Sequence, residues 1–332
     1  MVMMGVALAV LSGLCNGLFT TPMKLESRWK WENIWFTFIL VACLLMPAAL
    51  VFSSAGWSSA LMRAPRYSVV AALSFGFAWG FGAICFGKSV HSIGVSMANT
   101  LVIGLSSALG SLVPLFMKSE VHVGTKQLVL FAGVIALLIG VAVCGKAGRL
   151  RDGEQQTQGI VPLAGYLFAL AAGVMSAVFN IGYAMALPIS DTGVGIGLSR
   201  FAATNCIWLL MLGAGSIPNI VYCMLLMYRN QTAQLLHVPA SWSSWGRSSA
   251  MGLLWAGSIF LYGAATPKLG ALGPSVGWPL SLAVGLLVAN LMGVLLGEWR
   301  GAAGRPVKWM WIGLAILLAA IVLCGISTRF PE

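Results

Sequence analysis

The sequence predicts an all-α integral membrane protein with ten transmembrane helices, arranged as two inverted repeats of five helices. Its composition is the first observation behind this. Of the 332 residues, 59% are hydrophobic and only 8% are charged, whereas soluble domains carry about a quarter charged residues. Because the basic residues lie in short gaps between apolar runs, the net charge of +11 does not indicate a nucleic-acid partner. We expect a protein whose surroundings are the lipid bilayer.

The spacing of the apolar runs is the second observation. Each run is about as long as the 17–25 residues that a helix needs to cross a bilayer. "GAGSIPN" in the overlong seventh run predicts a break or tilt there. The first five runs predict one repeat over 1–150, a linker over 151–160 and a second repeat over 161–332. The runs lie near 3–21, 33–53, 67–87, 92–117, 127–145, 161–184, 197–228, 249–267, 272–296 and 307–326.

Internal similarity is the third observation. "GFAWGFGAICFG" (76–87) aligns with "GLLWAGSIFLYG" (252–263), which pairs Trp79 with Trp255 and Gly76 with Gly252. An odd number of spans in each copy forces the two copies into opposite orientations, which is a common construction of secondary transporters. Further alignments join 93–96 to 272–275, 137–145 to 317–325 and, more weakly, 13–20 to 173–180.

Residues 82–89, "GAICFGKS", match the phosphate-binding pattern GxxxxGK[ST]. That pattern works when a strand precedes the loop and a helix follows it, so that backbone N–H groups surround the phosphates. Here the match lies inside an apolar span, and the aligned copy has Ala264 in place of Lys88. We therefore predict no nucleotide site and no ATP hydrolysis.

The remaining composition bears on cofactors and on orientation. All seven cysteines fall inside apolar runs without metal-ligand spacing, so we expect no metal and no cofactor. The gaps that follow the first, third, fifth, seventh and ninth spans lie on one side of the membrane. They contain more Lys and Arg residues than the gaps and ends on the other side. The positive-inside rule then places both termini on the non-cytoplasmic side.

Two spans carry matching interruptions, "GVSMANT" (94–100) and "GPSVGWP" (273–279), and such pairs indicate the binding site of a transporter. Asn99 and Thr100 align with Trp278 and Pro279. An amide for hydroxyl groups and an indole for C–H faces would suit a sugar, although Asn99 could equally bond a neighbouring helix. For the tryptophans, packing is an equal alternative. The substrate-binding candidates are Asn99, Thr100, Trp278, Ser275, Asn16, Asn180, Trp79, Trp255 and Tyr262.

Proton coupling needs a group that changes charge within the membrane field. All eight acidic residues lie at span ends or in loops. The coupling candidates are Glu32, His91, Lys88 and Glu298; the alternative for each is an interfacial charge that anchors a helix. Sodium coupling through backbone carbonyls remains open.

Several motifs resemble the L-rhamnose–proton symporter family of the drug/metabolite transporter superfamily. They are "PMK…WKWENIW", "GFAWGFGAICFG", "SIGVSMANT", "GSIPNIVYC" and "GEWRGAAGRPV", and the likeness runs from the first span to the last. The resemblance implies the ten-helix drug/metabolite transporter fold around a central cavity, alternating access, and proton-coupled sugar uptake across the bacterial inner membrane.

The predicted function is therefore secondary active import of a monosaccharide such as L-rhamnose with protons. The partners are a small neutral solute and a proton. The first alternative is a metabolite or drug exporter of the same superfamily, and the second is sodium-coupled solute uptake. An intramembrane enzyme would need paired catalytic groups or clustered metal ligands at span depth, which the sequence lacks, so we expect no enzyme. A scaffold protein would not need two spans interrupted in parallel.

Overall fold

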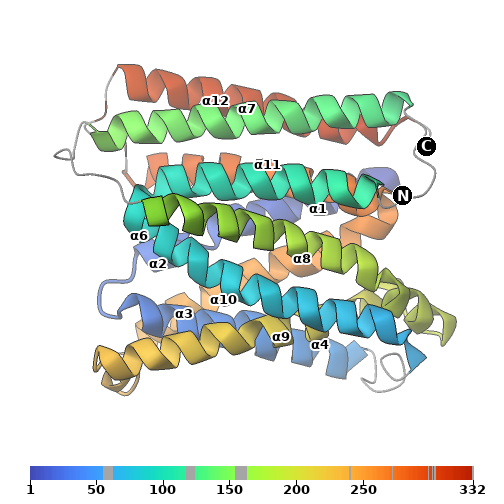
Figure 1. Cartoon of the computed structure of the whole chain (residues 1–332), viewed down its shortest axis with the longest axis horizontal. Coiled ribbons are helices and arrows are strands. Elements are labelled where there is room, and N and C mark those ends of the chain that lie inside the picture. Colours follow the sequence, from blue (N-terminus) through green and yellow to red (C-terminus); the bar gives the residue numbers. More distant parts are fainter. Residues whose placement is uncertain are drawn as a thin grey trace. The chain divides into compact units, whose positions relative to one another are not determined.

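The computed structural model describes residues 1–54, 63–116, 124–153, 163–238, 241–270, 272–297, 299–300, 302 and 304–330. Within these ranges the regular secondary structure is helical throughout (Figure 1). The helices are α1 (Val2–Leu18), α2 (Thr21–Lys24), α3 (Trp31–Ile39), η1 (Leu40–Leu45), α4 (Met46–Ser54), α6 (Arg66–Phe116), α7 (Thr125–Gly153), α8 (Leu163–Gly195), α9 (Arg200–Arg229), η2 (Ala233–Leu236), α10 (Trp242–Ala265), η4 (Thr266–Lys268), α11 (Gly273–Leu295) and α12 (Arg305–Ser327).

Nine segments of the described chain are long and apolar enough to cross a membrane. A tenth apolar segment, Leu101–Val113, is shorter. These ten segments correspond in order to the ten predicted runs. The expectation of a largely apolar, multi-span helical chain is confirmed.

Helix α6 contains two of the predicted runs, 67–87 and 92–117, which we expected as separate helices. It is helical from Arg66 to Phe116, but its course reverses. Positions 82 and 105 both lie beside α8 at nearly the same level, because Gly82 approaches Met175 and Leu105 approaches Gly173. The chain therefore turns back between positions 82 and 105, in the stretch where the sequence predicts an interruption at 94–100.

The helices that contain Pro218 and Pro279 are not broken as predicted, and the alternative of a tilt at "GAGSIPN" stays a prediction. Helix α9 continues through Pro218, and α11 begins at Gly273 with Pro279 inside it. A proline removes one backbone donor and leaves a carbonyl of the preceding turn without its partner. Near Pro218, Ser216 donates to the Gly213 carbonyl at 2.7 Å and Asn219 donates to the Gly215 carbonyl at 3.0 Å. Both side-chain bonds go to the carbonyls on either side of Ala214, whose own carbonyl loses its backbone partner to the proline, and the helix continues through this turn.

A wide π-helical turn, η1, joins α3 to α4. The N–H of Met46 bonds the Val41 carbonyl five residues earlier, and Pro47 follows with no donor of its own. The predicted second span is therefore one helical rod with a local bulge, of a kind that occurs often at functional sites.

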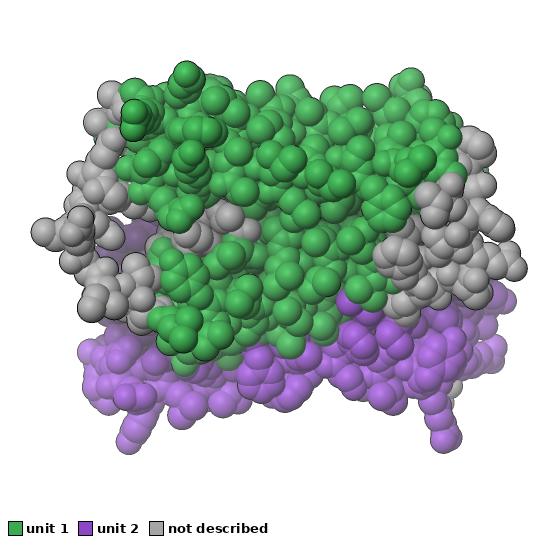
Figure 2. Space-filling view, turned by 45° about the horizontal axis from the view of Figure 1, so that its top comes forward, with its two compact units in different colours: residues 1–17, 82–180, 265–332 green, residues 18–81, 181–264 purple. Residues whose placement is uncertain are grey.

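The chain forms two compact units, coloured separately in Figure 2. Unit 1 comprises residues 1–17, 82–180 and 265–332, and unit 2 comprises residues 18–81 and 181–264. Each unit contains segments from both predicted repeats. The domain boundaries predicted at 150 and 161 follow the order of the chain and stay predictions.

In unit 1, α7 and α12 lie side by side (Figure 1) and contact each other through reciprocal pairs. A methyl group added at Gly133 would lie 2.7 Å from the Cys324 sulfur, and one added at Gly313 would lie 2.5 Å from the Cys144 sulfur. Gly133 and Gly313 are separated by 180 residues, and so are Cys144 and Cys324. When residue i contacts j and its equivalent contacts the equivalent of j in return, the two elements are related by local two-fold symmetry.

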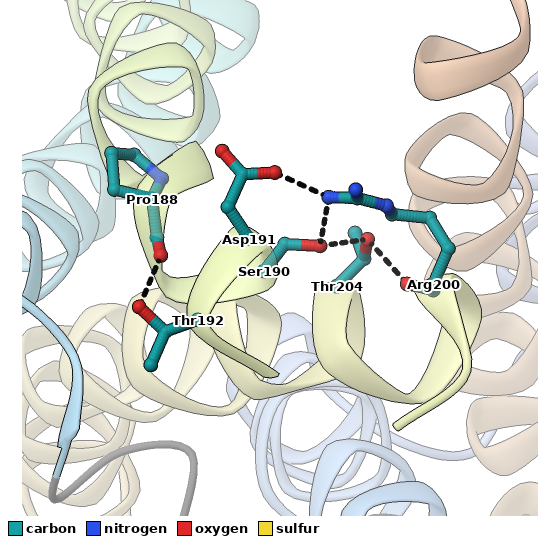
Figure 3. Close-up of polar contacts among 6 residues, drawn as sticks. All are labelled: Pro188, Ser190, Asp191, Thr192, Arg200 and Thr204. Atoms are coloured by element: carbon teal, nitrogen blue, oxygen red, sulfur yellow. Dashed lines mark hydrogen bonds and ion pairs between the residues drawn. The ribbon is translucent and has the colours of Figure 1, made fainter. Parts of the chain in front are cut away.

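In unit 2, polar side chains fasten the turn between α8 and α9 (Figure 3). Ser190 and Thr204 share a hydrogen bond of 3.0 Å, and Arg200 pairs with Asp191. Ser199 caps α9 by accepting from the Ala202 N–H at 3.2 Å. Because the side chains of Asp191 and Arg200 are largely exposed, we expect at most about 1 kcal/mol from their ion pair. This cluster holds a helical turn together.

Candidate substrate-binding and coupling residues

In unit 1, the Asn180 amide joins three helices. Its Nδ2 donates to the Gly110 carbonyl on α6 at 2.7 Å and toward the Pro274 carbonyl on α11 at 3.4 Å. The side chain is fully buried. Interhelical amide bonds of this kind stabilise membrane bundles. Asn180 therefore has a clear part in packing.

Trp278 fills the space beside this amide. Its Nε1 donates toward both the carbonyl and the hydroxyl of Ser106 at 3.3 Å, and it is 7% exposed. Ser106 in turn donates to the Ser176 hydroxyl at 2.8 Å. A methyl group at Gly110 would lie 2.7 Å from Trp278 Nε1, so only glycine allows the indole this close. The indole is engaged on every polar atom it has.

A second interface in unit 1, between α1 and α11, repeats this pattern. The hydroxyls of Ser12 and Ser281 are 2.8 Å apart. One turn further along, a methyl group at Gly285 would lie 3.1 Å from Asn16 Nδ2. Small residues on both helices permit this approach, as is common between membrane helices.

The two interfaces share one register. Ser12 and Asn16 are each separated by 164 residues from Ser176 and Asn180. On the partner helices, Ser106 and Gly110 are each separated by 175 residues from Ser281 and Gly285. Each interface therefore has a serine–serine contact and, one turn later, an asparagine–glycine contact.

This register corrects the sequence alignment of the two interrupted spans. An offset of 175 places Trp278 level with Ile103, whereas the alignment had paired Trp278 with Asn99. Glycine and alanine recur so often in these helices that a shift of four residues, one turn, preserves the apolar pattern. The contacts between side chains favour the offset of 175 residues, whereas the sequence alone does not distinguish it from the offset of 179.

The two asparagines differ in environment. Asn180 is fully buried and bonded to two carbonyls. Asn16 is half-buried, and no hydrogen bond joins its amide to another described residue. An amide in this position can bond hydroxyl groups of a solute. Of the two, Asn16 is better suited to a binding role.

In unit 2, Trp79 and Trp255 stack on each other. Their ring centroids are 5.2 Å apart and their planes differ by 15°. Phe38 meets Trp255 edge to face at 5.8 Å and packs against Trp35 at 4.8 Å. Both stacked tryptophans are half-buried. The duplicated pair predicted from the sequence therefore meets in space and keeps part of its aromatic surface accessible.

Tyr262 is placed differently. It is almost fully buried and packs against Tyr183 at 5.5 Å and Trp208 at 6.2 Å. Tyr183 and Trp208 stack at 4.4 Å. Gly263 is needed here, because a methyl group would meet the Trp208 ring. Tyr262 is part of an aromatic core, and any contact with substrate stays a prediction.

Glu32 lies in the first turn of α3 and is 5% exposed. Its Oε1 accepts from Asn230 Nδ2 and from the Thr232 hydroxyl, each at 2.9 Å. The adjacent Asn33 donates to the Thr232 carbonyl at 2.9 Å. A carboxylate near a helix N-terminus is also favoured by the helix dipole. These contacts tie α3 to the end of α9, and both coupling and anchoring stay predictions for Glu32.

Glu26 is an acidic residue that the sequence did not single out. Its side chain is inaccessible, pairs with Arg247 at 3.2 Å and accepts from the Ser244 hydroxyl at 2.9 Å. Burial raises the pKa of Glu26, but hydrogen bonds from the Arg28 and Trp29 backbone, Ser244 and Arg247 outweigh it and hold the pKa below its ordinary value. Its partners on α10 are more than 200 residues away, so no local pattern could reveal them.

The remaining candidates are either placed away from these contacts or lie outside the described residues. Lys88 is exposed, with its Nζ 5.2 Å from the Phe168 ring centroid, and Ser275 is buried. The side chains of His91, Asn99 and Thr100, and the whole of Glu298, lie outside the described residues. Within the described part of the chain, no three His, Cys, Asp or Glu residues gather as a metal site would need.

A family model described as L-rhamnose-proton symport protein (RhaT) matches residues 1–328. The chain belongs to this family. Two relatives named L-rhamnose-proton symporter cover 98% of this chain and 97% of their own length. One, from Klebsiella pneumoniae (strain 342), is 24% identical over 336 residues. The other, from Salmonella gallinarum (strain 287/91 / NCTC 13346), is 23% identical over 345 residues.

One solved structure, titled "Crystal structure of protein", has a similar fold. It superimposes over the whole of both chains with a TM-score of 0.62 and 14% sequence identity. Together with the nine spans, membership of the RhaT family makes this chain a multi-pass membrane protein.

Proposed function

We propose that the chain is a secondary active transporter that imports L-rhamnose or a closely related monosaccharide together with protons. It works by alternating access between two inverted five-helix repeats, in the bacterial inner membrane, with both termini on the non-cytoplasmic side. The names of its relatives support the sugar and the proton.

The observation that carries the proposal is the reciprocal contact between α7 and α12. Gly133 meets Cys324 as Gly313 meets Cys144. A two-fold axis that exchanges two antiparallel helices lies perpendicular to both, hence in the plane of the membrane. Repeats related in this way are inverted. Alternating access follows when the two repeats exchange their conformations, which converts a cavity open to one side of the membrane into a cavity open to the other side.

The predicted substrate-binding side chains fall into two groups, those that are half-buried and those that are buried. Trp79 and Trp255 keep accessible aromatic surface and can stack on the C–H faces of a sugar, while the Asn16 amide can bond its hydroxyls. Asn180 and Trp278 are buried in helix contacts, which supports a structural part for them. Asn99 and Thr100 stay candidates on sequence grounds.

The decisive experiment is uptake into proteoliposomes, with a panel of sugars and an imposed pH or sodium gradient. A potential of 100 mV is worth about 2.3 kcal/mol per proton moved, so accumulation of about fiftyfold is expected for one proton. We expect L-rhamnose to accumulate under the proton gradient alone. Accumulation driven only by sodium, or solute movement only against the imposed direction, would contradict the proposal.

Glu32 is the coupling candidate whose geometry allows a clean test. In Glu32→Gln, the amide oxygen can still accept from Asn230 and Thr232, so the helix contact survives while the titrating group is lost. We expect normal membrane expression and loss of sugar-dependent alkalinisation. Asp191→Asn removes an exposed acid as a matched control and should leave coupling unchanged. Normal alkalinisation in Glu32→Gln would assign Glu32 to anchoring alone.

A further inference from the structure

A basic hollow opens in unit 1 where the end of α7 meets the start of α12. It has a volume of about 490 Å³ and is lined by Lys146, Leu150, Arg305, Lys308, Trp309 and Ile312. Three of the six lining residues carry a positive charge. Among the described residues, none of these three cations forms an ion pair with an acid. The hollow therefore gathers three basic side chains within one concave surface.

Two cations at this end of the helices are held over indole rings. Lys146 Nζ lies 3.6 Å from the centroid of Trp309, and the Arg151 guanidinium lies 5.0 Å from that of Trp299. A cation over an indole face is attracted to it and so keeps a restricted position. Tryptophan is also enriched at the level of lipid headgroups. The hollow thus combines fixed charge with the residue type typical of the headgroup layer.

Exposed apolar side chains continue from the hollow along both helices. They include Ile135 and Ile139 on α7 and Trp311, Ile312 and Leu318 on α12. A ligand with a charged head and hydrocarbon tails would match both parts of this surface. A soluble anion would match only the hollow.

The opposite end of the same helix pair provides an internal comparison. At the offset of 180 residues, Lys146 corresponds to Ile326, Arg305 to Thr125 and Lys308 to Leu128. The packing of α7 against α12 is therefore maintained at the other end without any of these charges. The basic side chains are not a requirement of the helix contact.

We propose that this hollow binds the phosphodiester headgroup of an anionic phospholipid. Lys146, Arg305 and Lys308 contact the phosphate oxygens, and the acyl chains lie along the exposed apolar faces of α7 and α12. Anionic lipids are recognised in this way by basic pockets between membrane helices. The inference is independent of the transported substrate.

Native mass spectrometry of the full chain in detergent tests the proposal, with phosphatidylglycerol and zwitterionic phosphatidylethanolamine as probes. We expect phosphatidylglycerol to be retained in preference. Because each basic residue contributes about fivefold to anionic lipid binding, Lys146→Gln with Lys308→Gln should weaken retention roughly 25-fold. Arg149→Gln with Arg229→Gln removes the same charge from exposed positions outside the hollow and should weaken retention clearly less than the first double variant does.

Equal retention of the two lipids, or equal losses in the two double variants, would overturn the proposal. A third arm adds millimolar inorganic phosphate during the binding of phosphatidylglycerol. We expect little competition, because phosphate lacks the acyl chains. Full displacement by inorganic phosphate would identify a soluble anion as the ligand and would also overturn the assignment to lipid.

Discussion

The α1–α11 and α6–α8 interfaces of unit 1 share a register but differ in how far their polar groups are satisfied. In the α6–α8 interface, Asn180 bonds two carbonyls and Trp278 closes over Ser106. In the α1–α11 interface, Asn16 occupies the equivalent position, is half-buried and has no equivalent bonds among the described residues. The Asn180 amide is used in a contact between helices, whereas the Asn16 amide has no such bond among the described residues.

The difference shows that two asparagines in the same register, Asn16 and Asn180, need not make the same contacts. A buried amide in a membrane helix must be satisfied internally, since no water is available in the hydrocarbon layer. Once it is satisfied, it has no donor left for a solute. Our proposal therefore assigns substrate contact to Asn16 and a packing role to Asn180.

Trp278→Ala should show the largest effect on stability. Removing a buried tryptophan leaves a cavity and costs about 3–5 kcal/mol. The free energy of unfolding can be measured in mixed micelles by titration with a denaturing detergent. Trp242→Ala, at a side chain that is 85% exposed, should change it by less than about 0.5 kcal/mol. Similar small losses in both variants would refute the packing role of Trp278.

Substituting Gly110 and Gly285, the glycines at equivalent positions in the two interfaces, should have the next largest effect and should change the free energy of unfolding differently. In Gly110→Ala the new methyl meets the buried Trp278 ring, and overpacking of this kind costs about 1–3 kcal/mol. In Gly285→Ala it meets the end of the Asn16 side chain, which can rotate away. Alanine also gains about 0.5–1 kcal/mol over glycine within a helix, so we expect Gly285→Ala to be neutral or slightly stabilising. Equal destabilisation by the two variants would show that the interfaces are equally tight.

Asn180→Ala and Asn16→Ala should differ least in the free energy of unfolding and most clearly in sugar transport. Asn180→Ala should lose about 0.6–1.7 kcal/mol, the range measured for polar contacts between membrane helices. Asn16→Ala should unfold like the parent protein but raise the apparent KM for sugar uptake about two- to tenfold, as the loss of one hydrogen bond predicts. Unchanged uptake in Asn16→Ala, measured beside equal expression, would remove Asn16 from the binding site.

Much of the fold was predictable because membrane spans depend on local composition. The ten apolar runs were visible in the letters, and the two tryptophans that the sequence aligned, Trp79 and Trp255, are the ones that stack in unit 2. The breaks predicted near Pro218 and Pro279 were wrong, because each helix continues through the proline despite the missing backbone donor. The sequence alignment of α11 with α6 differs by one helical turn from the register that the contacts give. Repetitive small residues align equally well at several offsets, so the sequence could not decide between them.

For the candidate site, the sequence supplied the residue types and the structure decided between their roles. Composition alone determined a helical membrane protein, because hydrocarbon excludes charged side chains and unpaired backbone groups regardless of how the helices are arranged. Whether an amide or an indole faces another helix or remains accessible depends on neighbours distant in the chain. Only the tertiary structure brings those neighbours together, as it does for Glu26 with Arg247 and for Asn180 with Gly110.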